Sequence, residues 1–252
     1  MRYIASCSFG KDSLATILLA LEHGEPLDEA VYCEVMFDTD ISGEIPEHRD
    51  FIYETCIPFL ETHGVKLTIL RSSMTYMDSF FRVIQKGENA GKLNSWPLCG
   101  RCCIQRDCKL PPITAYQKSL STDTVQYIGY AYDEQERLLR LREGKTVSLL
   151  AKYRKTEADA VDICKRVGLY SPIYAFTSRN GCFFCPNAKR KELRHLYDHH
   201  PDLWARLVAL QGTPNKVTER FNRSQRIDEI DEGFRWEDRQ YTLFDKFAGQ
   251  GS

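Results

Sequence analysis

The chain has 252 residues, of which 42% are hydrophobic and 27% are charged, and this length suits one or two domains. The composition is typical of a folded globular protein and excludes a largely disordered or collagen-like chain. Since 34 Lys and Arg residues balance 35 Asp and Glu residues, the formal net charge is -1. No overall basic field therefore points to nucleic-acid binding, although a local basic patch is compatible with this balance.

Strands and helices alternate along the first part of the chain, as judged from the spacing of apolar residues. Strands are predicted at residues 2–7, 30–37, 65–70 and 125–130. Helices are predicted at residues 13–23, 46–63, 75–86 and 103–120. This alternation predicts an α/β fold with a parallel twisted sheet flanked by helices, and ligands in such folds bind at the carboxyl ends of the strands.

The pattern changes near residue 156. Helices are predicted at residues 156–167 and 189–210, the second with a break near Pro201, and the segment from residue 213 is polar. We therefore expect two parts: an α/β domain over residues 1–155, and a smaller, mostly helical C-terminal part over residues 156–252 packed on it.

The ten cysteines fall into two classes. Scattered cysteines in apolar surroundings are expected to be inert core residues, namely Cys7, Cys33, Cys56 and Cys164. The other six are clustered: Cys99, Cys102, Cys103 and Cys108, then Cys182 and Cys185. Two C-x-x-C pairs, 99/102 and 182/185, can together supply four thiolates to one metal centre, which would belong to the C-terminal part. The alternative is a set of loop cysteines without a ligand.

The cellular compartment bears on how these cysteines are interpreted. The first residues lack the apolar run of a signal peptide, and no stretch approaches the roughly 18 apolar residues that span a bilayer. We therefore expect a cytoplasmic protein without a membrane segment. Clustered cysteines in that reducing compartment indicate metal binding or catalysis rather than disulfides.

The most specific chemical motif lies at the first junction between strand and helix, Ser8-Phe9-Gly10-Lys11-Asp12-Ser13. A tight turn before a helix directs backbone N–H groups and the positive helix end at an anion, and Gly10 and Lys11 assist with close approach and charge. This is not a Walker A loop, because Ala5 occupies the first glycine position and Asp12 follows the lysine. The alternative is an ordinary helix N-cap by Asp12 or Ser13.

Three further segments complete a pattern with this hexapeptide. They are Phe37-Asp38-Thr39-Asp40 with residues 43–47, Gly129-Tyr130-Ala131-Tyr132-Asp133-Glu134 with Arg137, and Ser171-Pro172-Ile173-Tyr174 with residues 181–186. In this order they resemble the PP-loop superfamily of N-type ATP pyrophosphatases, and within it the phosphoadenylyl-sulfate (PAPS) reductase-like family. The resemblance covers residues 2 to about 190 and implies an adenine nucleotide alpha hydrolase-like, Rossmann-like fold.

The resemblance implies a site for ATP with Mg²⁺. Nucleotide-binding residues would be Ser8, Phe9, Gly10, Lys11, Asp12, Ser13, Asp38 and Gly129, and catalytic residues would be Lys11, Asp12, Asp133, Glu134 and Arg137. Carboxylates beside a polyphosphate can hold Mg²⁺, and an arginine can grip phosphate with two hydrogen bonds. Without the resemblance, Glu134 and Arg137 would be interpreted as a surface ion pair at helical spacing.

The cysteine clusters take part in the same resemblance. Cys102-Cys103-Ile104-Gln105-Arg106 is similar to a C-C-x-x-R segment of the iron–sulfur branch, the assimilatory adenylyl-sulfate reductases. This implies a [4Fe-4S] cluster on Cys102, Cys103, Cys182 and Cys185. Spacing alone favours Cys99 with either Cys102 or Cys103 and the second pair, a set that also suits Zn²⁺. Cys108 is expected to be a spare helix residue.

Two departures from the family's reductases affect the expected reaction. Those enzymes carry a nucleophilic cysteine near the C-terminus, whereas the last cysteine here is Cys185, and Ala131 replaces an arginine of the family segment. The chain resembles more closely the sulfurtransferase-like proteins of DNA phosphorothioation systems and phages. We therefore expect an ATP-dependent sulfur-transfer enzyme that adenylylates an acceptor and releases pyrophosphate.

Two alternatives from other classes stay open. One is an adenylyl-sulfate or PAPS reductase with a non-standard thiol such as Cys99 or Cys108. The other is a non-catalytic ATP-binding subunit of a defence or mobile-element system. DNA, tRNA and a small metabolite are all open as acceptors, and the sequence leaves partner proteins and the oligomeric state undetermined.

A basic segment could contact a nucleic-acid backbone: Lys189, Arg190, Lys191, Arg194 and His195, with Arg220, Arg223 and Arg226. The alternative is a solvated helix face. His195, His199 and His200 are expected on that exposed helix, where their spacing does not by itself complete a metal site.

Overall fold

The computed structural model describes residues 1–97, 102–120, 123–179 and 181–248. The chain forms two compact units, one of Met1–Thr75 with Arg106–Cys182 and one of Tyr76–Gln105 with Phe183–Ser252. This division differs from the boundary expected between residues 155 and 156. The helix over residues 157–166 belongs to the first unit because its buried side chains join that unit's core.

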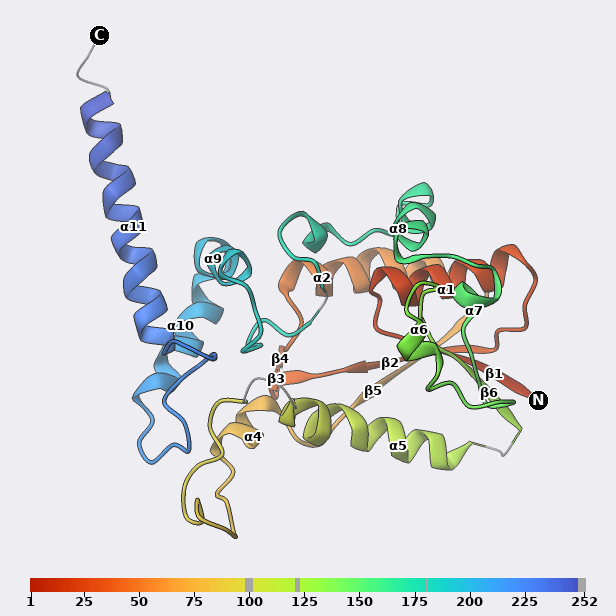
Figure 1. The fold of residues 1–252 in the computed structure, drawn as a ribbon, viewed down its shortest axis with the longest axis horizontal. Helices are drawn as coiled ribbons and strands as arrows, with labels where there is room; N and C mark the ends of the chain where they lie inside the picture. Colours follow the sequence, from red (N-terminus) through yellow and green to blue (C-terminus); the bar gives the residue numbers. More distant parts are fainter. Residues whose placement is uncertain (98–101, 121–122, 180, 249–252) are drawn as a thin grey trace. The chain divides into compact units, whose positions relative to one another are not determined.

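A five-stranded parallel sheet forms the centre of the first unit (Figure 1). The strands lie in the order β5-β2-β1-β6-β7, with bounds β1 (Arg2–Cys7), β2 (Glu29–Glu34), β5 (Lys66–Arg71), β6 (Thr124–Tyr127) and β7 (Thr146–Val147). In the register, Ile4 of β1 is opposite Glu29 of β2 and Gln126 of β6. The predicted α/β class with a parallel sheet is confirmed.

The strands differ from the prediction in two places. The predicted strand at residues 30–37 is divided into β2 and a short strand β3 (Met36–Asp38), which pairs antiparallel with β4 (Ile41–Ser42). Strand β7 was not predicted, because two residues are too short to give a recognisable periodicity.

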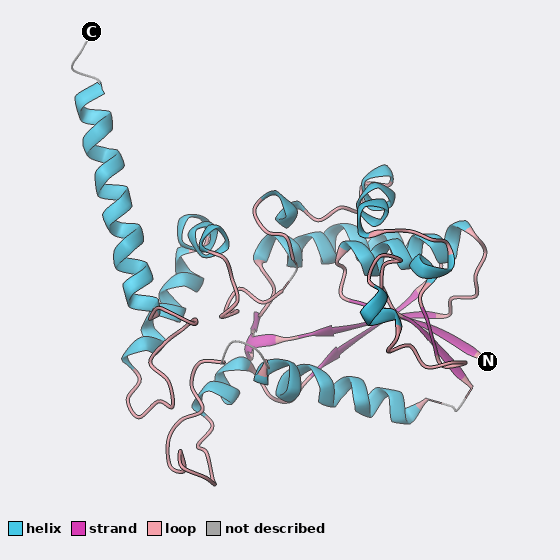
Figure 2. Ribbon diagram, viewed as in Figure 1, coloured by secondary structure: helices cyan, strands magenta, loops and turns pink. Residues whose placement is uncertain are grey.

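Helices cover both faces of this sheet (Figure 2). One face carries α1 (Lys11–Glu22), α7 (Leu149–Lys152), α8 (Glu157–Arg166) and the continuous helical run of α2 (Pro46–Asp50), the π-helix η1 (Phe51–Cys56) and α3 (Ile57–Thr62). The other face carries α5 (Leu110–Ser119), which follows the π-helix η2 (Gln105–Lys109). The short helices α6 (Gln135–Leu138) and η3 (Pro172–Ala175, a 3-10 helix) lie in connections.

Local signals in the sequence explain where α1 and α8 begin and end. Helix α1 is buried along Ser13–Ala20 and is followed by Gly24, whose φ of 61° is the left-handed conformation that ends helices. Helix α8 starts with a capping box between Thr156 and Asp159 and is followed by Gly168 with a φ of 74°. These signals place α8 so that it packs against α1.

The scattered cysteines are buried, as predicted. Three of them, Cys7, Cys56 and Cys164, belong to the main core of the first unit. Burial raises the pKa of Cys7 to about 11 and that of Cys164 to about 12. Because the thiolate is the reactive form of cysteine, these side chains are inert at neutral pH.

The second unit is helical and has its own aromatic core. Its elements are α4 (Tyr76–Phe81), α9 (Arg190–His199), α10 (Pro201–Ala209), the 3-10 helix η4 (Leu210–Gly212) and α11 (Ile227–Ala248). The Trp96 ring lies 5.1 Å from that of Phe80 and 5.3 Å from that of Phe221, both edge-on. The break at Pro201 is confirmed.

Helix α11 was not predicted. Its apolar residues Ile227, Ile230 and Phe234 are buried and stand at the spacing of one helix face, a signal that was overlooked in a segment that is polar overall. Within the described ranges, no helix combines the length and apolar character that crossing a membrane requires.

Candidate nucleotide-binding site

The predicted phosphate loop lies at the point where the sheet changes its direction of growth. From β1 the chain first adds β2 and β5 on one side, and then returns to add β6 and β7 on the other side. The connections that follow β1 and β6 therefore diverge, and open α/β sheets bind ligands in the crevice at that point, outside the carboxyl ends of the strands. Residues 8–13 follow β1 there.

The N-cap residue of α1 makes no side-chain capping hydrogen bond. This residue is Gly10, and neither Asp12 nor Ser13 caps the helix, so the alternative of an ordinary N-cap is wrong. The Ser13 hydroxyl instead accepts the N–H of Ser8 at 3.2 Å and donates to the carbonyl of Gly10 at 2.9 Å. By contrast, Ser148 and Thr156 cap α7 and α8. An uncapped helix start next to a lysine suits an anion.

Phe9 is the buried residue of the predicted phosphate loop. It has a φ of 55°, a left-handed conformation that is uncommon outside glycine. Its side chain is fully buried, and its ring meets that of Tyr32 edge-on at 5.1 Å. Of the predicted nucleotide-binding residues, Phe9 therefore contributes backbone geometry rather than a side-chain contact.

Gly129 brings the connection after β6 against the first turn of α1. A Cβ atom at this position would lie 2.8 Å from the carbonyl carbon of Asp12 and 2.9 Å from the amide nitrogen of Ser13. Any larger residue would force the two backbones apart. The structure thus brings Gly129 together with the phosphate loop, and close packing explains why glycine stands there.

Lys11 and Asp12 form a charged pair at the start of α1. The Lys11 Nζ lies 2.9 Å and 3.0 Å from the two carboxylate oxygens of Asp12, and 3.2 Å from Oε2 of Glu157. Burial raises the pKa of Asp12, Lys11 opposes this shift, and the charges of Glu157 and Glu134 add to it. Sequence reasoning missed Glu157, because it was interpreted only as part of the opening turn of α8.

The predicted catalytic residues after β6 adjoin this pair. Arg137 donates to Oε1 of Glu134 at 2.6 Å and stacks over the Tyr130 ring at 4.3 Å. The Asp133 carboxylate accepts the N–H of Glu157 at 3.1 Å. The ion pair between Glu134 and Arg137 is therefore present. Burial lowers the pKa of Arg137, but the hydrogen bond and charge of Glu134 outweigh burial, with a smaller contribution from Asp12, so the pKa lies above its usual value.

Asp38 lies in the segment that follows β2. It ends β3, and its carboxylate accepts the N–H of the next residue, Thr39, at 2.8 Å. The contact recorded for this side chain is thus local, and its expected position near the nucleotide stays a prediction.

The segment of residues 171–174 is linked to the predicted phosphate loop through its first and last residues. The amide of Lys11 donates to the Tyr174 hydroxyl at 3.0 Å. Ser171 reaches the loop through His48, whose ring lies 2.9 Å from the Ser171 hydroxyl and 3.4 Å from the carbonyl of Ser8. Sequence reasoning missed His48; its only signal was a histidine within the predicted helix over residues 46–63.

The clustered cysteines differ from the core cysteines in exposure. Cys102, Cys103, Cys182 and Cys185 are all half-buried, while Cys99 lies outside the described residues. Cys102, Cys103 and Cys185 belong to the second unit, and Cys182 is the last residue of the first. Cys108 is fully buried and donates to the carbonyl of Thr75 at 3.5 Å, in accord with a spare helix residue.

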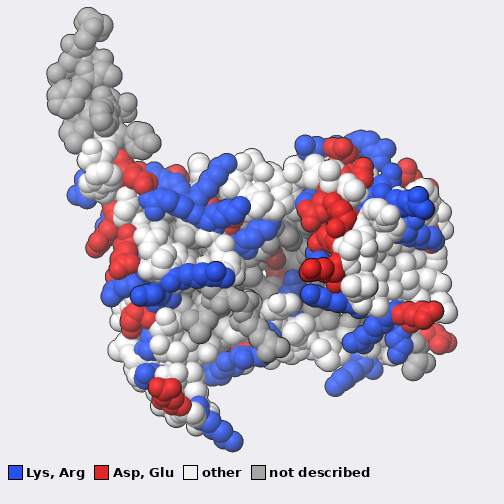
Figure 3. All heavy atoms as spheres, viewed as in Figure 1, with Lys and Arg blue, Asp and Glu red and all other residues white. Residues whose placement is uncertain are grey.

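Three arginines of the predicted basic segment pair with carboxylates of α11. Arg190 pairs with Glu237, Arg194 with Asp238 and Arg226 with Asp228. Basic and acidic side chains are interspersed on the face shown in Figure 3. These pairs favour a solvated, ion-paired helix face, and a nucleic-acid contact by Lys189, Lys191, Arg220 and Arg223 stays a prediction.

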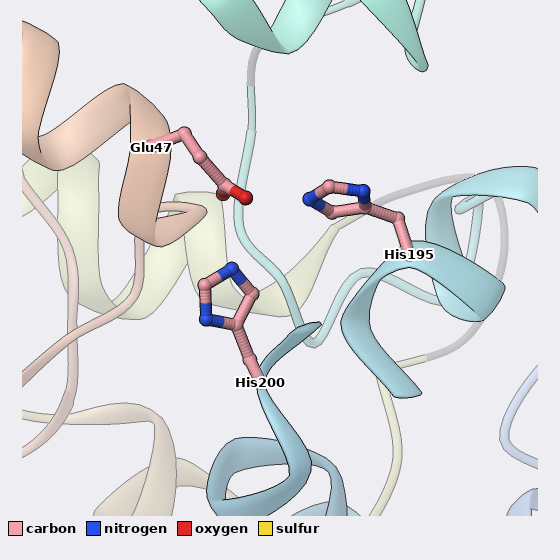
Figure 4. A group of neighbouring side chains, drawn as sticks. All are labelled: Glu47, His195 and His200. Atoms are coloured by element: carbon pink, nitrogen blue, oxygen red, sulfur yellow. The ribbon is translucent and has the colours of Figure 1, made fainter. Parts of the chain in front are cut away.

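Three histidine rings lie close together at the end of α9. The rings of His195 and His199 are 4.5 Å apart, and those of His195 and His200 are 5.9 Å apart. Figure 4 shows His195 and His200; Glu47, also labelled there, belongs to α2 of the first unit. His199 is exposed, whereas His195 and His200 are half-buried, so the prediction that the three histidines lie on an exposed helix holds only for His199.

No protein-family model matches this chain. No curated protein matches it either. Among solved structures, the chain is similar to the U34-tRNA thiolase NcsA from Methanococcus maripaludis with its [4Fe-4S] cluster. The two are 15% identical, the match covers 93% of this chain and 70% of that chain, and the TM-score is 0.41.

Proposed function

We propose that this protein is an ATP-dependent sulfur-transfer enzyme of the PAPS reductase-like kind, which activates an acceptor by adenylylation and releases pyrophosphate. One observation carries the nucleotide part of this proposal: the uncapped start of α1, with Lys11 beside it, lies at the carboxyl end of β1 where the sheet changes direction. The close contact of Gly129 with Asp12 supports this proposal, because it holds the connection after β6 against the start of α1.

The phosphates of ATP would bind to the backbone of residues 8–13. The start of α1 offers N–H groups and the positive end of the helix dipole. Lys11, now shared between Asp12 and Glu157, would turn toward the phosphates. Asp12, Asp133 and Glu134 are the carboxylates that would hold Mg²⁺, which offsets phosphate charge.

In the reaction, an oxygen of the acceptor attacks the α-phosphorus of ATP. The bond from that phosphorus to the bridging oxygen breaks, and pyrophosphate leaves with the electron pair. Lys11 and Arg137 would stabilise the charge that develops. A sulfur nucleophile then displaces AMP from the adenylylated acceptor, so that a carbon–sulfur or comparable bond replaces the bond to AMP.

The half-buried cysteines support the sulfur part of the proposal. Cys102, Cys103, Cys182 and Cys185 would hold a [4Fe-4S] cluster, or alternatively Zn²⁺, since thiolates ligate both. This cluster or ion would either deliver the sulfur or hold the surrounding segments in place. DNA, RNA or a small metabolite are the acceptor classes to be screened, and a partner protein is a further open component.

The reductase alternative is weakened by one observation. It needs an accessible nucleophilic thiol, and Cys108, one of its two candidates, is fully buried. Sulfite release that depends on thioredoxin or glutathione would nevertheless establish that activity. Nucleotide binding without turnover would establish the non-catalytic alternative.

The test is pyrophosphate release from ATP by protein purified without oxygen, with Mg²⁺, a sulfide source and a panel of acceptors. Lys11→Ala and Asp12→Ala should reduce the rate by at least about 100-fold, the usual effect of losing a group that stabilises transition-state charge. Lys118→Ala and Asp162→Ala are the matched controls, since both side chains are exposed on other helices. Rates unchanged by the loop variants would refute the assignment.

A further inference from the structure

His48 is a buried histidine that lies directly behind the phosphate loop. It belongs to α2, within the first unit, and none of its surface is exposed. Its ring stacks on that of Phe51 at 6.1 Å with an interplanar angle of 20°. A polar ring in such a place requires hydrogen-bond partners, and it has two.

Its two partners determine which ring nitrogen carries the hydrogen. Nε2 lies 3.4 Å from the carbonyl oxygen of Ser8, which can only accept a hydrogen bond. Nε2 must therefore carry the hydrogen, and Nδ1 must accept from the Ser171 hydroxyl at 2.9 Å. Burial lowers the pKa of His48, and the nearby Glu44 opposes that shift without cancelling it, so the ring is neutral at physiological pH.

The contact with Ser8 acts on the backbone of the loop itself. The carbonyl of Ser8 and the N–H of Phe9 belong to one peptide plane, so a bond that directs the carbonyl also directs the N–H. Phe9 follows with its left-handed φ of 55°, a conformation that persists only when surrounding contacts hold it. Its N–H points in the opposite direction from the Ser8 carbonyl and donates to Cys7 Sγ at 3.4 Å.

We propose that His48 is a positioning residue of the predicted phosphate loop: its Nε2–H holds the carbonyl of Ser8, and Ser171 holds the ring, so that the peptide between Ser8 and Phe9 is fixed and the N–H groups that follow Phe9 are directed at the phosphates of a nucleotide. This inference rests on the proposed function for its ligand. The observations that carry it are the full burial of His48 and the pair of contacts that join Ser8 to Ser171.

The matched variants His48→Gln and His48→Asn separate positioning from packing. The amide N–H₂ of glutamine extends about as far as Nε2 of histidine and can still donate to Ser8, whereas the asparagine amide reaches only as far as Nδ1. Both variants bury an amide of similar polarity. ATP and inorganic pyrophosphate should therefore bind about tenfold more weakly to His48→Asn, the effect of losing one hydrogen bond, and within about threefold of wild type to His48→Gln.

The kinetic readout follows from the same argument. His48→Asn should raise the KM for ATP with little change in kcat, because the loop is mispositioned while the folded fraction is unchanged. A purely structural role would lower the active fraction, and hence kcat, with KM unchanged. Equal losses of affinity in both variants, or no loss in either, would overturn the proposal.

A ligand-free readout separates this inference from the proposed function. If the wild-type protein binds neither ATP nor pyrophosphate, the proposed function fails. The positioning role is then judged by nitrogen NMR of the six histidines, with His48 assigned from the variants. The expected results are an Nε2–H tautomer for His48 and faster amide exchange of Gly10 in His48→Asn than in His48→Gln; an Nδ1–H tautomer or equal exchange would refute it.

Discussion

The backbone N–H of Lys11 donates a hydrogen bond to the hydroxyl of Tyr174, at a distance of 3.0 Å. Lys11 is the first residue of α1, so this N–H is one of the donors that a helix leaves without an internal partner. It is also a donor that a phosphate at this helix start would use. The Tyr174 hydroxyl therefore occupies, in the ligand-free protein, a position that suits a phosphate oxygen.

Tyr174→Phe should lower the stability of the ligand-free protein and increase the stabilisation that ATP provides. The variant keeps the ring stacked on Tyr170 at 4.8 Å but leaves the Lys11 N–H without its partner, at a cost of about 1 kcal/mol. A bound phosphate would restore the lost bond. Thermal unfolding with and without ATP measures both effects. If ATP stabilises the variant and the wild type equally, the phosphates do not use this N–H.

Gly129→Ala should destabilise the protein by about 1–3 kcal/mol and weaken ATP binding, because the new methyl group would overlap the backbone of Asp12. Gly212→Ala is the matched control, since a Cβ at that position meets no atom within 4 Å. Urea denaturation should show a loss for the first variant and a change within about 0.5 kcal/mol for the second. Equal stability of the two variants would contradict the close approach.

Glu157→Gln should tighten ATP binding by a few-fold at low salt. Glu157 contacts the Lys11 ammonium at 3.2 Å, and its charge also lies near Asp12, where a polyphosphate would add further negative charge. Removing one like charge from a half-exposed position is worth up to about 1 kcal/mol. Calorimetric titration of the variant and of the control Glu54→Gln checks this, and weaker binding would instead identify Glu157 as a ligand-binding group.

Glu29 should contribute stability that disappears in acid. This fully buried carboxylate accepts from Tyr116 at 2.6 Å and from Thr68, and it pairs with Arg2 and Lys66. Burial raises its pKa, but these partners outweigh burial, so the pKa lies below the usual value of 4.5. The stabilisation is therefore complete above about pH 4.5 and is lost as the pH falls through the lowered pKa of the folded state.

The substitution Glu29→Gln tests this sign. The variant should be less stable than wild type at pH 7 by about 1–3 kcal/mol, and the difference should shrink in acid. The exposed Glu61 provides the control Glu61→Gln, for which no such convergence is expected. If the free energies of unfolding of Glu29→Gln and wild type differ by the same amount from pH 7 to pH 3, the lowered pKa is contradicted.

Thiol reactivity should divide the cysteines as their burial does. After metal removal by a chelator, Ellman's reagent should modify the half-buried Cys102, Cys103, Cys182 and Cys185 rapidly, whereas all ten cysteines react in denaturant. Cys185→Ser should lower the number of rapidly reacting thiols per chain by one, and Cys108→Ser should leave that number unchanged. Equal reactivity of these thiols before and after chelation would argue against a metal centre on them.

Several features could be predicted from local sequence. The strand at residues 2–7 and the helix after it follow from an apolar run and from apolar residues at helical spacing, and the capping box at Thr156 marks the start of α8. The turn at residues 8–13 was predicted for the same reason, because Gly10 and Lys11 are neighbours in the chain. Helix α11 was overlooked, although Ile227, Ile230 and Phe234 stand at helical spacing in a segment that is polar overall.

The sequence by itself determined the alternation of strands and helices, the position of the turn at residues 8–13 and the separation of core from clustered cysteines, since these depend on residues close together in the chain. Only the tertiary structure decided that Gly129 touches Asp12, that Glu157 shares Lys11, and that His48 links Ser8 to Ser171. Each of these contacts joins residues more than 35 positions apart. Such contacts follow from strand order and helix packing, which no local pattern encodes.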